Sequence, residues 1–244
     1  MQVLAAHDIT VLTPNIQQVL LDFQAAYDMV NRTRLWEKLH TQFGVEKPLL
    51  HKLQLLFDGN SSCLLVEGEK SRFIPNQRGL LQGSSLSPLL FKLSLNDLLL
   101  SLQEEHQPAI TIRNNRFNHL AFADDIVLFA RTPGGMHHLL KVCEDWSILN
   151  GMKFAATKCI FVGDENIHDY RIYNVPISSE KQPKYLGIPL GGNGIDLALN
   201  AQQRATKTRA VTHMLAELGM NSTGFPQEAS VSMYKAFIRP TFED

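Results

Sequence analysis

A pair of neighbouring carboxylates interrupts one of the most apolar stretches of the sequence. The stretch reads AFADDIVLFA, from Ala121 to Ala130, and its only charged residues are Asp124 and Asp125. Burying one unpaired charge is costly, and two like charges side by side also repel each other. The pair must therefore lie on an exposed turn or be held in place by something positive. The apolar runs on either side predict two strands joined by a hairpin at the pair.

The composition is that of an ordinary globular protein. Of 244 residues, 44% are hydrophobic and 19% are charged, which is enough apolar material for a core. Lys and Arg number 23 against 24 Asp and Glu, and this net charge of -1 argues against strong independent nucleic-acid binding, because such proteins are usually basic.

The three cysteines form no CxxC pair and fit buried, reduced thiols. Neither a signal peptide nor a membrane-spanning run is recognised, so we expect an intracellular protein, in the cytoplasm, the nucleus or both.

Strands and helices are mixed along the chain. Apolar runs predict strands at 19–23, within 110–130, and at 159–163, 170–174 and 184–190, and helical spacing predicts helices at 32–43, 47–57, 86–102, 134–150, 197–218 and 226–239. Asn31 is a candidate N-cap and Gly151 a helix stop. The core order strand-helix-strand-strand-helix-strand matches the split βαβ, ferredoxin-like arrangement. We therefore predict an α+β fold in which helices back an antiparallel sheet.

In that arrangement the hairpin that carries Asp124 and Asp125 lies beside the strand that ends at Asp22. Three carboxylates at the ends of buried strands suit a divalent-metal site, because Mg²⁺ prefers oxygen ligands and usually takes one or two carboxylates plus substrate phosphates. Two such ions about 4 Å apart can activate an attacking hydroxyl and stabilise a leaving pyrophosphate. Spacing alone leaves an ordinary structural turn equally acceptable.

Five segments, in order along the chain, resemble the motifs of one enzyme family. LLDFQAAYDMV resembles motif A of the reverse transcriptases, NQRGLLQGSSLSPLLF motif B and AFADDIVLFA motif C. LNGMKFAATKC resembles motif D and KYLGIPLGG motif E. Each motif alone is weak, whereas the joint match is specific and extends from about Val19 onward. Two segments, RGLLQGSSLSP and MYKAFIRPTFE, resemble the sequences of the non-LTR (LINE-type) retrotransposon branch in particular.

The resemblance implies an RNA-directed DNA polymerase with a role for each matching residue. Asp22 and Asp124 would bind two Mg²⁺ ions, with Mn²⁺ as a substitute, and Asp125 would be the third acidic residue. The backbone carbonyl of Phe23 would also face a metal. Lys158 matches the motif D lysine that is proposed to protonate the leaving pyrophosphate, although a solvated surface lysine is an equal alternative.

Further residues would hold the nucleotide and the primer. Tyr27 matches the aromatic steric gate that rejects a 2′-hydroxyl, although it could also be a plain core aromatic. Gln82 and Gly83 would line the nucleotide pocket, with Arg78 nearby. The hairpin that positions the primer 3′ end would include three residues, namely Tyr185, Leu186 and Gly187.

The resemblance also predicts the domain organisation. Residues 1–192 would form the palm with reduced fingers, including a fingers-like insertion at about 32–80, and residues 193–244 would begin a helical thumb. The partners would be an RNA template, a DNA primer and dNTPs, with no membrane. Only 21 residues precede Asp22, so we expect the family's long basic fingers region to be missing or reduced.

Two other hypotheses remain. The chain could be a truncated, catalytically weak or inactive retrotransposon relic that folds and binds nucleic acid or a partner. It could also be another two-metal enzyme on a ferredoxin-like core, such as a nucleotidyl cyclase, although motifs B, D and E argue against that chemistry because it has no primer to hold. For the metal-free protein we expect an electronegative site in which at least one carboxylate has a raised pKa.

Overall fold

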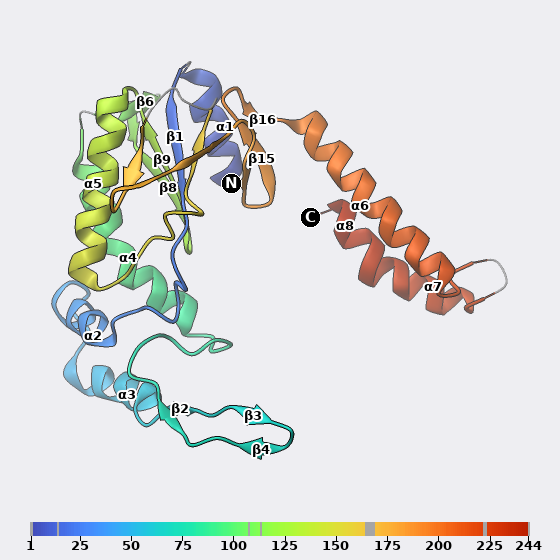
Figure 1. Ribbon diagram of the computed structural model, residues 1–244, viewed down its shortest axis with the longest axis horizontal. Helices are drawn as coiled ribbons and strands as arrows, with labels where there is room; N and C mark the ends of the chain where they lie inside the picture. The colour runs from blue at the N-terminus through green and yellow to red at the C-terminus, as the bar shows by residue number, and fades with distance from the viewer. Residues whose placement is uncertain are drawn as a thin grey trace.

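A five-stranded sheet lies at the centre of the computed structural model, which describes residues 2–13, 15–106, 108–112, 114–163, 169–221 and 224–243 (Figure 1). The strand order is β13-β10-β1-β9-β8. The strands are β1 (Gln17–Leu21), β8 (His119–Phe122), β9 (Asp125–Ala130), β10 (Ile160–Val162) and β13 (Ser178–Glu180). Without β13, the order and the antiparallel pairings are those of the predicted split βαβ arrangement.

The edge strand β13 makes the sheet mixed. It pairs parallel with β10, with Ile160 opposite Ser178, so the prediction of a wholly antiparallel sheet is wrong at this edge. A parallel neighbour requires a crossover of a dozen or more residues. Part of that crossover is the small antiparallel hairpin of β11 (Arg171–Ile172) and β12 (Val175–Pro176), and β11 packs on helix α5 (Pro133–Asn150).

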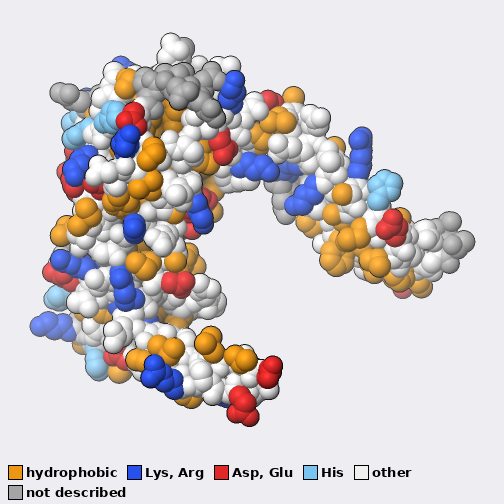
Figure 2. Space-filling model, viewed as in Figure 1, with side chains coloured by type: hydrophobic (Ala, Val, Ile, Leu, Met, Phe, Trp, Pro, Cys, Tyr) orange, Lys and Arg blue, Asp and Glu red, His pale blue; other side chains and the backbone are white. Residues whose placement is uncertain are grey.

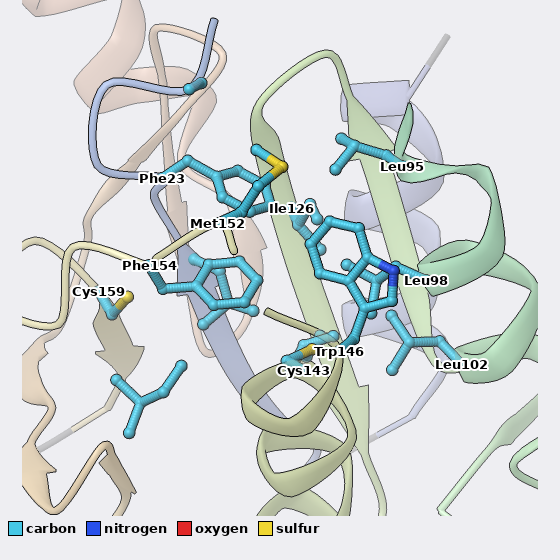
Figure 3. Packing of buried hydrophobic residues seen from close by; sticks show 14 of the residues in the cluster. Phe23, Leu95, Leu98, Leu102, Ile126, Cys143, Trp146, Met152, Phe154 and Cys159 are labelled. Carbon is cyan, nitrogen blue, oxygen red and sulfur yellow. The ribbon is translucent and has the colours of Figure 1, made fainter. Parts of the chain in front are cut away.

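Both faces of the sheet are covered. Helices α4 (Ser87–Glu104) and α5 pack on one face, and α1 (Gln2–Leu12) packs on β8 near the other (Figure 1). Strand β9 is buried on both sides, because alternate residues belong to two different apolar clusters. The larger cluster joins the sheet to α4 and α5 through aromatic and aliphatic side chains (Figure 3).

Local sequence signals explain several element ends. Asn31 caps α2 (Arg32–Thr41), since its side chain accepts a hydrogen bond from the N–H of Arg34. Gly151 ends α5 with φ 64°, in the left-handed region that glycine tolerates. Helix α3 (Lys47–Phe57) has the predicted bounds and carries Pro48 in its first turn.

After α3 the chain forms an arm, residues 61–75, that extends away from the sheet (Figure 1). Its short strands are β2 (Ser61–Ser62), β3 (Leu65–Val66), β4 (Glu69–Lys70) and β5 (Ile74–Pro75), paired β2 with β5 and β3 with β4. These antiparallel pairings make the arm a long β-hairpin whose tip carries Glu67 and Gly68. Hydrophobic side chains are visible along the arm (Figure 2).

The remaining elements lie beside α1 and beyond it. Two small hairpins are β6 (Ile110–Ile112) with β7 (Asn115–Phe117), and β14 (Lys184–Tyr185) with β15 (Ile188–Gly191), to which β16 (Gly194–Ile195) adds. Helix α6 (Leu197–Glu217) then leads away, and α7 (Gln227–Met233), the π-helical segment η1 (Tyr234–Ile238) and α8 (Arg239–Glu243) return along it. Within the described ranges, none of the helices, α6 included, is both long and apolar enough to cross a membrane.

Gln18 is a buried amide in β1 that the fold does not fully satisfy. The hydroxyl of Thr10 approaches its Oε1 at 3.4 Å, and within the described residues its Nε2 has no hydrogen-bond partner. We expect Gln18→Met, which keeps the shape, to raise the free energy of unfolding by about 1 kcal/mol. Thr10 still donates to the carbonyl of Ala6.

Urea unfolding measures this effect, and the neighbouring glutamine is the control. Gln17 accepts a 2.9 Å hydrogen bond from the hydroxyl of Tyr170, so Gln17→Met should lower the free energy of unfolding by about 1 kcal/mol. A Gln18→Met variant that unfolds as easily as Gln17→Met would contradict the assignment of an unsatisfied amide.

Candidate active site

The pairing of β1 with β9 brings Asp22 beside Asp124 and Asp125. Asp22 directly follows β1, and the register places Leu21 opposite Ile126, the residue after Asp125. Asp22 is half-buried and Asp125 is exposed. This is the juxtaposition that the sequence predicts.

The carboxylate hairpin closes with a loop of only two residues. Phe122 pairs with Asp125, which leaves Ala123 and Asp124 to form the turn between β8 and β9. Ala123 has φ 53°, in the left-handed region that residues with a Cβ rarely adopt. The surrounding strands therefore hold the turn in a strained conformation, and such strain is often found at functional sites.

The carboxylate of Asp125 interacts electrostatically with those of Asp124 and Asp22. The pKa of Asp125 is raised, first by desolvation of its carboxyl group and then by the negative charges of Asp124 and Asp22. The expectation of at least one raised carboxylate pKa is confirmed.

The three carboxylates could supply only part of the coordination shell of a metal ion. Among the described residues, no group of three or more His, Cys, Asp or Glu side chains is placed to hold a metal ion. Mg²⁺ needs only one or two carboxylates when substrate phosphates complete its shell. The all-oxygen donor set of Asp22, Asp124 and Asp125 fits such a shared site.

Among the described residues, Lys158 forms the ion pair with this acidic cluster. Its Nζ lies 3.5 Å from Oδ2 of Asp22, and its side chain is 71% exposed. A tight turn places it there, because the N–H of Ala155 donates to the carbonyl of Asp22 and the N–H of Lys158 donates to the carbonyl of Ala155. Lys158, the motif D candidate, therefore lies beside the candidate metal ligands, in a position that solvent can reach.

Phe23 presents its backbone near the hairpin while its ring lies in the core. The ring stacks on Phe154 at 4.3 Å between centroids and meets Trp146 edge-on (Figure 3). Phe23 and Phe154 form an isolated antiparallel bridge, flanked by hydrogen bonds of Asp22 and Gln24 to the partner segment. In such a pair the backbone groups of Phe23 itself point away from the partner.

Tyr27 lies in the turn that follows Phe23. Its half-buried ring stacks on Phe91 of α4. The pKa of Tyr27 is raised by burial and then by the negative charge of Asp124. The phenol of Tyr27 therefore lies within electrostatic range of Asp124.

The loop of residues 78–83 lies against the turn that carries Tyr27. The amide of Gln82 donates to Asp28 at 3.3 Å. Gly83 has φ 86° and open space around it. The guanidinium of Arg78, predicted near the nucleotide, donates to the carbonyls of Met29 and Gly151. Arg78 therefore joins two loops as the structure stands.

Sequence reasoning missed two residues that shape this loop. Gly79 has φ 83°, and a Cβ there would approach the carbonyl oxygen of Asp28 to 2.8 Å, so only glycine fits. Its place in the segment QRGLLQG was the available signal. Arg32 donates to four backbone carbonyls at the base of the arm, and nothing in the sequence pattern indicates this; the acceptors are Phe57, Asn76, Arg78 and Gly79.

The predicted primer-positioning hairpin also approaches the carboxylates. Tyr185 is buried, and its pKa is raised to about 12 by burial and then by the charge of Asp125. Leu186 and Gly187 form the turn, both with positive φ, as a two-residue hairpin of type I′ requires. Between this turn and helices α6 and α8 lies a groove of about 800 Å³, which includes Lys184 and Lys207.

Asp125→Asn should make the metal-free protein more stable at about pH 7, by less than about 1 kcal/mol, because partly exposed charges interact weakly. The folded-state pKa of Asp125 lies above its unfolded value. At pH values between these two pKa values, the folded protein therefore binds one proton that the unfolded chain has lost. The wild type should therefore lose stability as the pH rises from about 4 through the folded pKa. Urea midpoints across this pH range measure it, and parallel pH profiles for the two proteins would rule it out.

A family model described as "Reverse transcriptase (RNA-dependent DNA polymerase)" matches residues 8–190. Curated relatives include the Pol polyprotein of the type-2 retrotransposable element R2DM of Drosophila melanogaster, 34% identical over 143 residues. That match covers 59% of this chain and 13% of the relative. The R2 Pol polyprotein of Popillia japonica is 30% identical over 145 residues, which cover 59% of this chain and 20% of the relative.

Solved structures with a similar fold include two telomerases. Apo telomerase of Candida tropicalis has a TM-score of 0.58 at 12% identity, covering 80% of this chain and 35% of that one. The telomerase of Candida albicans in complex with a telomeric RNA fragment has a TM-score of 0.58 at 10% identity, covering 98% and 41%. The chain spans less than a third of the length of the curated relatives it matches. It belongs to the reverse transcriptase family and is homologous to the Pol proteins of R2 non-LTR retrotransposons.

Proposed function

We propose that this chain is the catalytic part of an RNA-directed DNA polymerase. It would transfer a nucleotide from a dNTP to the 3′-hydroxyl of a primer on an RNA template. The observation that carries the proposal is the meeting of Asp22 with Asp124 and Asp125 across the β1–β9 pairing, in a chain of this family.

The carboxylates would hold two Mg²⁺ ions, or Mn²⁺ in their place. Asp22 and Asp124 would be the principal ligands, with Asp125 as the third acidic group and the Phe23 carbonyl as a backbone ligand. Such ions activate the attacking hydroxyl and stabilise the charge of the leaving group. Lys158, beside Asp22, would give a proton to the pyrophosphate.

The substrate would lie between the parts of the chain that surround the carboxylates. Tyr27 would limit the space at the sugar, and the loop with Gln82 and Gly83 would line the nucleotide pocket, with Arg78 keeping that loop in place. The β14–β15 turn would position the primer end, through Tyr185, Leu186 and Gly187.

We assign the sheet with α4 and α5 to the palm, residues 32–80 to a reduced fingers region, and residues 193–244 to the start of a thumb. Lys and Arg side chains are visible near the start of α6 on the side that faces the hollow of the molecule, and also on the opposite side of the helix (Figure 2). The groove with Lys184 and Lys207 opens beside the β14–β15 turn. Cations there suit the phosphates of a nucleic-acid strand.

Primer extension tests the proposal. The protein is given a DNA primer on an RNA template, dNTPs and Mg²⁺ or Mn²⁺, and the expected result is template-dependent DNA. The alternative is a chain that binds nucleic acid without polymerising. No synthesis with either metal, together with salt-dependent retention of the primer–template, would support that alternative and sink the polymerase.

A further inference from the structure

We propose that Phe91 is a positioning residue for Tyr27, and that it sets how strongly the site discriminates deoxynucleotides from ribonucleotides. The inference rests on the proposed polymerase function, in which Tyr27 limits the space at the sugar. Phe91 itself is fully buried in α4, so it would act only through the tyrosine ring.

The contact between the two rings is close and nearly parallel. Their centroids are 4.7 Å apart and their planes differ by 17°. Phe91 also meets the ring of Phe23 edge-on, at 6.3 Å and 89°. Stacked and edge-on pairs of this kind add to the stability of the contact beyond the area they bury. One ring of α4 therefore touches both the sugar-gate candidate and the residue that follows Asp22.

Tyr27 needs this support because its backbone is in a turn. The segment from Gln24 to Met29 has neither helical nor strand structure. The carbonyl of Tyr27 accepts a 2.8 Å hydrogen bond from the N–H of Leu80. That bond locates the backbone and leaves the side-chain torsions free. Functional groups on loops depend on neighbouring packing for their geometry, and Phe91 supplies a flat surface fixed by a long helix.

The consequence concerns selectivity. A gate works through a clash with one extra oxygen atom, so its position must be held to well under the size of that atom. If the ring of Tyr27 can tilt away from its stacked position, a 2′-hydroxyl fits. Deoxynucleotides gain nothing from that space, so the preference falls because ribonucleotides are used better.

The test compares the efficiency of dNTP and NTP incorporation in four proteins: wild type, Phe91→Leu, Tyr27→Val and the double variant. Leucine keeps the site apolar and removes the flat ring. We expect Phe91→Leu to lower the preference for dNTPs about tenfold, less than the roughly hundredfold loss that a misplacement of about 1 Å can cause. The double variant should equal Tyr27→Val alone. An unchanged preference in Phe91→Leu, or losses that multiply in the double variant, would overturn the proposal.

Leu98→Ala is the matched control, because Leu98 is equally buried and lies two turns further along α4. It should weaken the fold without changing the preference. A general loosening of the core would instead lower the preference in both variants, which also counts against Phe91.

A second measurement separates this inference from the polymerase function. Incorporation of 3-fluorotyrosine labels five tyrosines, and Tyr27→Phe identifies the Tyr27 signal. Phe91→Leu should shift that fluorine resonance, and Leu98→Ala should not. If the protein makes no DNA, the same resonance reports dGTP and GTP binding with Mg²⁺. The role of Phe91 would be overturned if the Tyr27 resonance does not shift in Phe91→Leu. It would also be overturned if wild type and Phe91→Leu prefer dGTP over GTP equally. Both outcomes apply whether or not the protein polymerises.

Discussion

Asp124→Asn is expected to lower RNA-templated primer extension by about a thousandfold or more. Asparagine keeps the size of the side chain and one oxygen ligand, but it removes the charge that a divalent cation requires. A metal ion at the reacting phosphate contributes several kcal/mol to the transition state, and about 4 kcal/mol corresponds to a thousandfold in rate. Initial rates on one primer–template, with Mg²⁺ and the four dNTPs, measure the loss.

The fold should tolerate this change, because Asp124 lies in a two-residue turn whose strands are held by β1 and by the core. Asp145→Asn serves as the control: Asp145 is exposed on α5 and pairs with Lys141 at 2.8 Å. It should leave the rate unchanged. An Asp124→Asn protein that melts like wild type and keeps more than about a tenth of its rate would remove Asp124 from the proposed mechanism.

Sequence alone was sufficient where the signal is local. The N-cap at Asn31 and the stop at Gly151 mark real helix ends, although α2 ends two residues earlier than the spacing predicts. The hairpin at the carboxylates follows from apolar runs on both sides of a charged pair. Its position beside Asp22 follows from the strand order, which the alternation of predicted strands and helices already limits to few arrangements.

Contacts between distant residues could not be predicted from such signals. The ion pair of Lys158 with Asp22 depends on a turn whose backbone bonds are formed only in the fold. Gly79 is a glycine because of a close approach by Asp28, which lies in another loop. The parallel strand β13 also had no signal, because short polar strands such as Ser178–Glu180 lack an apolar period.

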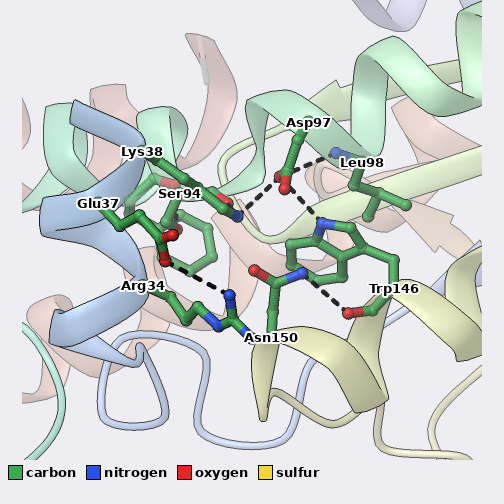
Figure 4. Close-up of polar contacts among 9 residues, drawn as sticks. Arg34, Glu37, Lys38, Ser94, Asp97, Leu98, Trp146 and Asn150 are labelled. Carbon is green, nitrogen blue, oxygen red and sulfur yellow. Dashed lines mark hydrogen bonds and ion pairs between the residues drawn. The ribbon is translucent and has the colours of Figure 1, made fainter. Parts of the chain in front are cut away.

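A buried polar network behind the candidate site is another such contact. One carboxylate oxygen of Asp97 on α4 accepts hydrogen bonds from Nζ of Lys38 at 2.8 Å and from Nε1 of Trp146 at 2.9 Å (Figure 4). Lys38 also donates to the carbonyl of Ser94 and lies over the indole ring, 5.2 Å from its centroid. Trp146 contacts Phe23, the residue after Asp22. The network therefore supports the candidate site through side chains of α2, α4 and α5.

Lys38→Met should lower the free energy of unfolding by about 3 kcal/mol. The side chain of Lys38 is 9% exposed and that of Asp97 is 26% exposed, so removing the cation leaves a partly buried carboxylate without its charge partner. Breaking a buried pair in this way typically costs about 3–5 kcal/mol, and the partial exposure of Asp97 places the expected value at the lower end. Urea unfolding at neutral pH measures the loss. Arg34→Met, on the same helix, removes an ion pair whose two side chains are about half exposed and should cost less than about 0.5 kcal/mol.

A double-mutant cycle distinguishes the charge pair from simple packing. Asp97→Asn keeps an oxygen that can accept from Trp146, while it leaves the Lys38 ammonium buried and unpaired; burial already lowers the pKa of Lys38 even with Asp97 present. The double variant Lys38→Met with Asp97→Asn buries no charge, so its loss should be smaller than the sum of the two single losses by at least about 1 kcal/mol. Additive losses would mean that the pair contributes only through the space it fills. A coupled cycle would instead show that charge balance between α2 and α4 holds Trp146 against Phe23, the residue that connects this network to Asp22.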